Sequence, residues 1–115
     1  MKLTRDKAIE EFRKMWNWIA DETERCGEKM WPEDYLHEFG FDWVQDDFLC
    51  EYKRQNKTCA CCGNCPISFN EDGGPAKDCE DAGSPYDAWY WEEDWKKAAE
   101  LARRIANLPE REEAL

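Results

Sequence analysis

A chain of 115 residues, of which 37% are charged and 14% aromatic, has the length of a single domain but a lean supply of apolar side chains. Its net charge of −11 excludes a general phosphate-binding surface, because such a surface needs clustered Lys and Arg side chains. No apolar run is long enough to cross a membrane, and the first residues lack the apolar core of a signal peptide. We therefore expect a cytoplasmic protein with one domain over residues 1–109 and a frayed tail over residues 110–115.

The first predicted element is an amphipathic helix over residues 5–24. Large apolar side chains recur along it at steps of three and four, namely Ile9, Phe12, Trp16 and Ile19. Thr4 suits the N-cap position, and Gly27 suits the left-handed residue that follows a helix. Trp18 falls beside the main stripe, and we place it at the edge of a wide apolar face. This face is expected to form one half of the core.

A second, short helix is predicted to begin at Pro32, with two acidic residues in its first turn, and to stop at Gly40. Its apolar side is made by Tyr35, Leu36 and Phe39. His37 is the only histidine of the chain. A lone histidine on a short, polar-edged helix is more often a surface or hydrogen-bonded residue than a metal ligand, so we expect His37 to be one of the former.

The last predicted element is a long helix that starts at Ser84 and runs to about Asn107, with a kink or a division near Glu92. Ser84 can cap this helix, and Pro85 fits its first position. The expected apolar stripe comprises Trp91, Trp95, Ala98, Ala102 and Ile105. Because the small residues of this stripe match the bulky stripe of the first helix, we expect the N- and C-terminal helices to pair. The predicted fold is mainly α, with room for a short β-hairpin at the metal site described next.

Six of the seven cysteines lie between the second and third predicted helices. In a reducing compartment, clustered cysteines favour metal binding over disulfides. Cys62 and Cys65 form a pair separated by two turn residues, as in tetrahedral zinc sites. Cys59 and Cys62 offer a second such pair, while Cys50 and Cys79 are more distant candidates. We expect one structural zinc ion that staples the domain; an iron–sulfur cluster, disulfides and a redox-active Cys62/Cys65 pair are the alternatives.

The segments around these cysteines form a further pattern. They are Leu49-Cys50-Glu51-Tyr52, Cys62-x2-Cys65-Pro66, Cys79 ahead of Tyr86 and Trp89, and Ala102 to Pro109. Together they resemble a group of small uncharacterised, cysteine-cluster proteins of tailed bacteriophages and prophages. Asp47 stands where that group often has the first cysteine of its segment. The resemblance implies a phage or prophage origin and a metal-ligand set of Cys50, Cys62, Cys65 and Cys79, with Cys59 as the alternative ligand.

Acidic residues gather on both sides of the cysteines, with seven acids against Lys29 in residues 26–49 and nine against Lys77 in residues 67–94. The sequence contains no Ser/His/Asp set and no phosphate-binding glycine loop, and one histidine leaves few general bases. We therefore predict a non-enzymatic, zinc-binding phage accessory protein that binds a partner protein. The sharper hypothesis is a basic, nucleic-acid-binding partner, such as a host defence factor, inhibited by an acidic surface that imitates DNA.

Three other interpretations stay open at this stage. The acidity can simply keep a Trp-rich protein soluble. The cysteines can serve iron–sulfur or redox chemistry instead of zinc. The chain can also be a structural or assembly module that presents Trp side chains to a partner, which a large exposed Trp patch would favour. Neither direct nucleic-acid binding nor membrane insertion is expected, and the oligomeric state is left open.

Overall fold

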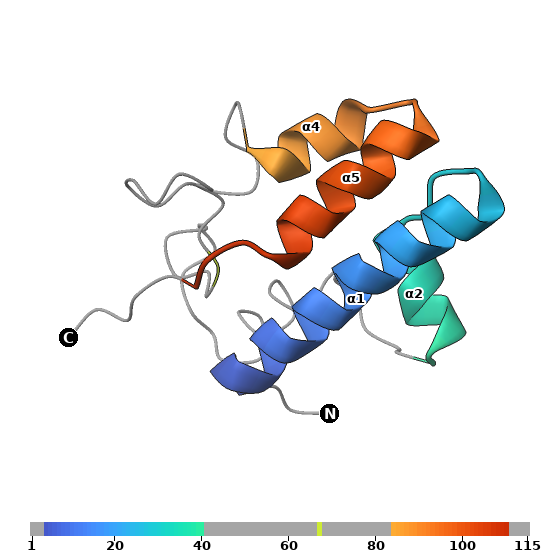
Figure 1. The fold of residues 1–115 in the computed structure, drawn as a ribbon. Coiled ribbons are helices and arrows are strands. Elements are labelled where there is room, and N and C mark those ends of the chain that lie inside the picture. The colour runs from blue at the N-terminus through green and yellow to red at the C-terminus, as the bar shows by residue number, and fades with distance from the viewer. Residues whose placement is uncertain (1–3, 41–66, 68–83, 111–115) are drawn as a thin grey trace.

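Four helices make up most of what the structure describes. The computed structural model describes residues 4–40, 67 and 84–110. In chain order the helices are α1 (Arg5–Cys26), α2 (Pro32–Glu38), α4 (Pro85–Trp91) and α5 (Trp95–Ala106). Helices α1 and α5 pack side by side, while α2 contacts α1 and α4 contacts α5 (Figure 1). The predicted mainly α fold with paired N- and C-terminal helices is therefore confirmed. The predicted zinc staple and β-hairpin lie outside the described residues.

Helix α1 forms where its capping residues and its apolar period predict it. The Thr4 hydroxyl accepts a hydrogen bond from the Lys7 amide at 3.1 Å, which satisfies one of the free N–H groups at the helix start. At the other end Gly27 adopts a left-handed φ of 69°, and its amide donates to the Thr23 carbonyl at 3.0 Å. The helix is two residues longer than the predicted range, because it continues through Cys26. Its buried face contains all four predicted residues of the stripe: Ile9, Phe12, Trp16 and Ile19.

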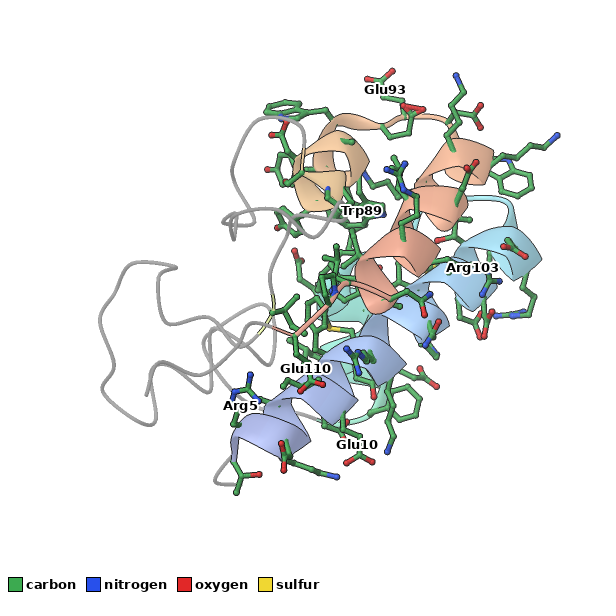
Figure 2. All side chains as sticks on the ribbon, turned by 60° about the vertical axis from the view of Figure 1, so that its left-hand side comes forward. Arg5, Glu10, Trp89, Glu93, Arg103 and Glu110 are labelled. Carbon is green, nitrogen blue, oxygen red and sulfur yellow. The ribbon has the colours of Figure 1, made fainter. Side chains whose placement is uncertain are left out.

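The interface between α1 and α5 joins bulky side chains to small ones, as predicted. From α5 it buries Ala98, Ala102 and Ile105. The short alanine side chains allow the two helix backbones to approach, and the aromatic and aliphatic side chains of α1 fill the space between them. Arg103 adds polar contacts along the outer side of this interface, 2.8 Å from Asp21 and 2.9 Å from Glu24 (Figure 2).

The predicted long C-terminal helix is divided near Glu92, as expected. The Ser84 hydroxyl accepts from the Asp87 amide at 3.1 Å and starts α4, and the Asp94 carboxylate accepts from the Lys96 amide at 2.9 Å and starts α5. The prediction that Trp91 belongs to the buried stripe is wrong, because its side chain is 74% exposed. The break changes the direction of the chain, so the register of α5 does not continue into α4. Trp89 is instead the fully buried residue of α4 (Figure 2).

Helix α2 packs against α1 through Tyr35 and Leu36, which are both buried. The Trp31 amide donates to the Asp34 carboxylate at 2.8 Å, so the first turn is closed by one of the two predicted acidic residues. The segment ends at Gly40, which has a left-handed φ of 74°. The predicted short helix is therefore confirmed.

The chain after α5 returns to the start of α1. Ile67 is fully buried and pairs with Glu110 in an isolated antiparallel bridge. Glu110 also lies 3.5 Å from Arg5, and the two side chains are neighbours in Figure 2. Residues 111–115 of the predicted tail are outside the described residues. Among the helices that are described, none is long and apolar enough to cross a membrane.

Candidate functional site

Three aromatic side chains from two distant parts of the chain meet at the surface. Trp31 precedes α2, and its ring lies edge-on to Tyr90 of α4 with 5.9 Å between the ring centroids. The Tyr90 and Trp91 rings are 5.1 Å apart. Tyr90 is 46% exposed and Trp91 is 74% exposed, although side chains of this size usually bury most of their area. We call Trp31, Tyr90 and Trp91 the aromatic edge.

The aromatic edge is anchored in the core by Trp89. The Trp89 ring is perpendicular to that of Trp16 at 4.8 Å and contacts that of Trp31 at 5.0 Å. These edge-to-face contacts match the preferred geometry of aromatic pairs. The exposed rings therefore continue a series of edge-to-face aromatic contacts that starts in the interface between the long helices.

Lys29 fixes the backbone that carries the exposed rings. Its ammonium donates to the carbonyls of Trp89 at 2.5 Å, Tyr90 at 3.1 Å and Glu92 at 3.1 Å. It also lies over the Trp31 and Trp89 rings, 4.4 Å and 4.2 Å from their centroids. The last carbonyls of a helix have no partner within the helix and carry partial negative charge, which a cation stabilises. Lys29 therefore caps α4 and ties it to the residue before α2.

The surroundings of Lys29 also shift its pKa. Burial lowers the pKa of the Lys29 ammonium from its ordinary value, and the Glu92 carboxylate opposes part of that effect. Three backbone carbonyls accept hydrogen bonds from the ammonium, which makes it a structural cation of the aromatic edge.

Carboxylates lie beside the aromatic edge in the turn between α4 and α5. This turn contains Glu92, Glu93 and Asp94. The Asp94 carboxylate accepts a hydrogen bond from the Lys96 amide, while Glu93 is exposed and projects from the turn (Figure 2). An apolar patch beside acidic side chains is suited to a partner with apolar and basic groups.

A second aromatic group lies between α1 and α2. The Trp18 ring contacts Tyr35 at 5.5 Å and Phe39 at 6.2 Å, so Trp18 lies at the edge of the apolar face as predicted. Burial, aided by the negative charge of Glu11 and a hydrogen bond to it, raises the pKa of the Tyr35 hydroxyl to about 12. Glu11 is itself buried and is paired with Lys7 at 3.1 Å.

The predicted metal ligands cannot be located in this geometry. Cys50, Cys62, Cys65 and Cys79, with the alternative Cys59, all lie outside the described residues. Within residues 4–40, 67 and 84–110, no group of three or more His, Cys, Asp or Glu side chains is arranged to hold a metal ion.

Two further residues of metal-binding type, Cys26 and His37, lie in the described region. Cys26 is an exposed thiol 3.9 Å from a Glu22 carboxylate oxygen. His37 is exposed, as predicted.

Sequence reasoning missed the aromatic edge, although one signal of it was present. Trp89, Tyr90 and Trp91 are consecutive, and consecutive helical residues point about 100° apart. A helix that rests on one neighbour can bury only one of three such side chains, so exposed rings were to be expected. Lys29 carries no comparable signal, because its partners are 60 or more residues away.

Comparison of this chain with protein-family models, with curated proteins and with solved structures found no match.

Proposed function

We propose that this protein is a non-enzymatic binding module that holds a partner protein against the aromatic edge. The observation that carries the proposal is the 74% exposure of Trp91 beside the half-exposed Tyr90. Trp and Tyr are the residues that most often dominate the binding energy of protein interfaces. Lys29 holds their backbone in place before binding, which reduces the conformational entropy that binding must remove.

The partner we propose is a basic protein. The net charge of −11 and the carboxylates next to the aromatic edge attract a basic surface and repel an acidic one. In its sharper form, the partner is a nucleic-acid-binding protein, such as a host defence nuclease, whose DNA-binding surface meets these carboxylates. A phage accessory role would follow from the resemblance noted in the sequence.

The test is to titrate the protein with two basic DNA-binding proteins, a bacterial nucleoid protein and a type II restriction endonuclease, at increasing salt. We expect saturable binding that weakens with salt and that Trp91→Ala reduces about tenfold, since hot-spot residues contribute ~1.4 kcal/mol or more. Asn17→Ala is the control, because Asn17 is exposed on α1, is uncharged and lies outside the aromatic edge. Binding that ignores salt, or that survives Trp91→Ala unchanged, contradicts the proposal.

For the cysteine-rich segment we propose one structural zinc ion bound by Cys50, Cys62, Cys65 and Cys79, with Cys59 as the alternative ligand. Thiolates separated by two turn residues are the chemistry that supports it. Elemental analysis should give one zinc per chain, and chelation or Cys65→Ser should lower the melting temperature, because a structural metal contributes folding free energy. A coloured protein with visible absorption would indicate an iron–sulfur cluster instead, and an unchanged melting temperature after complete metal removal would exclude the staple.

The same exposed rings favour a second candidate, an assembly module that associates with copies of itself. The two candidates differ in mass: self-association predicts a dimer or larger species in light scattering that Trp91→Ala converts to a monomer. A wild-type monomer would leave the basic partner as the proposed ligand of the aromatic edge.

A further inference from the structure

A cleft of 480 Å³ opens between α1 and α2. Its apolar lining includes the Trp18 ring and Met30, the residue before Trp31 of the aromatic edge. The Trp18 ring is held from the side by Tyr35 and by the half-exposed Phe39. The Trp18 ring is therefore held in place as one wall of the cleft. The cleft is large enough to accept one long side chain of a partner.

Four carboxylates line the cleft, and they are not equivalent. Glu22 is already occupied by Arg25, whose Nε donates to it at 2.6 Å, and Asp34 accepts the Trp31 amide. Glu33 and Glu38 are exposed and make no hydrogen bond or ion pair with any other described residue.

The basic side chains of the cleft do not cancel this charge. Arg25 is neutralised by Glu22 within the cleft, and His37 is the other basic residue there. The space beside Trp18 is therefore bordered by two carboxylates whose charge no described residue offsets.

The molecule already shows how a cation sits in such surroundings. The Lys29 ammonium lies over two Trp rings and is held by oxygen acceptors. The α1–α2 cleft likewise has a Trp ring and two carboxylates, Glu33 and Glu38, that no described cation pairs with. A guanidinium group fits these partners better than an ammonium, because it is planar, stacks on an indole and donates to two carboxylates at once.

We infer that the α1–α2 cleft binds an arginine side chain of the basic partner, stacked on Trp18 and paired with Glu33 and Glu38. The inference rests on the proposed function only for the basic character of the partner. Because Met30 in the cleft is adjacent to Trp31, one partner segment can contact the aromatic edge and place an arginine in the cleft. Charge complementarity, rather than apolar area alone, selects this occupant.

The probe is a blocked Gly/Ser heptapeptide with one central arginine, titrated at low salt while the indole N–H signal of Trp18 is followed by NMR. We expect a saturable shift of that signal, with weaker binding by the matched lysine peptide and none by the citrulline peptide, which has the same shape without the charge. Glu33→Gln and Glu38→Gln should each weaken binding about threefold, as for single partly exposed ion pairs. Glu100→Gln removes the same charge from an exposed position of α5 and is the control.

Three outcomes would overturn the inference. They are the absence of a saturable Trp18 shift, equal binding of the citrulline peptide, and equal weakening by Glu100→Gln, which would indicate attraction to the net charge alone. Trp91→Ala should leave the heptapeptide titration unchanged, since Trp91 does not line the cleft. The arginine site in the cleft and the binding role of the aromatic edge can therefore be disproved independently of each other.

Discussion

The α1–α5 interface and the aromatic edge both contain large aromatic side chains, but the interface buries them and the aromatic edge exposes them. In the interface, Trp16 has no exposed surface and belongs to the same buried core cluster as alanines of α5. At the aromatic edge, Trp91 is 74% exposed, and the chain around it is held by polar contacts to Lys29. Tryptophan content does not by itself indicate a buried core in this protein. The direction in which each ring points from its helix decides which rings are buried, as Trp89 is, and which are available to a partner, as Trp91 is.

The two regions should also respond differently to substitution. Packing in the interface is dense, so any loss of volume there leaves a cavity and lowers stability. The aromatic edge faces solvent, so a loss of side-chain volume there should affect binding far more than folding. The following predictions test this separation, from the largest expected change to the smallest.

Trp16→Ala should cost the most, about 3–5 kcal/mol of unfolding free energy. Trp16 is fully buried and contacts the rings of Phe12, Tyr86 and Trp89, so its removal leaves a large cavity. Urea denaturation followed by far-UV circular dichroism measures the change. A loss below about 1 kcal/mol would mean that the site collapses around the gap and that the interface is not tightly packed.

Lys29→Met should cost about 2 kcal/mol, because three carbonyls lose a charged donor while the side-chain volume is kept. Near-UV circular dichroism should change as well, since Trp31 and Trp89 lose the group that lies between them. Lys97→Met is the control, because Lys97 is exposed on α5. Equal effects of the two substitutions would show that Lys29 contributes only its charge to the net balance.

Tyr35 should make the protein less stable at alkaline pH. The folded-state pKa of about 12 exceeds the ordinary value of 10.0, so the contribution of the neutral hydroxyl is complete below pH 10 and is lost between pH 10 and about 12. At one pH unit above the ordinary pKa, the loss should be about 1 kcal/mol. Tyr35→Phe removes the titrating group, and the difference between the two pH profiles isolates it. Parallel profiles would place the Tyr35 pKa near its ordinary value.

Trp91→Ala should change the unfolding free energy by no more than about 0.5 kcal/mol, the usual range for exposed side chains. The same variant should lose most of the binding measured in the titration with basic proteins. A stability loss near that of Trp16→Ala would place Trp91 in the core in solution and contradict the separation of the two regions.

Much of the described fold was predictable because its signals are local. The Thr4 cap, the apolar period of the first helix and the left-handed residue Gly27 each concern neighbours within a few turns. The pairing of the outer helices also followed, since bulky and small stripes of similar length complement each other. The error at Trp91 came from extending one helical period across residues 92–94, where the chain changes direction. The zinc ligands stay a prediction.

The sequence by itself determined where α1, α2 and α4 start, which faces of α1 and α5 are apolar, and the acidic character of the molecule. Only the tertiary structure decided that Lys29 meets the end of α4, that Trp31 joins Tyr90, and that α1 and α2 leave a cleft beside Trp18. The physical reason is the sequence separation over which each kind of interaction acts. Caps and periodicity act between residues a few positions apart, whereas Lys29 finds carbonyls 60 to 63 positions away. Such contacts form only after the long helices have packed and brought the two segments together.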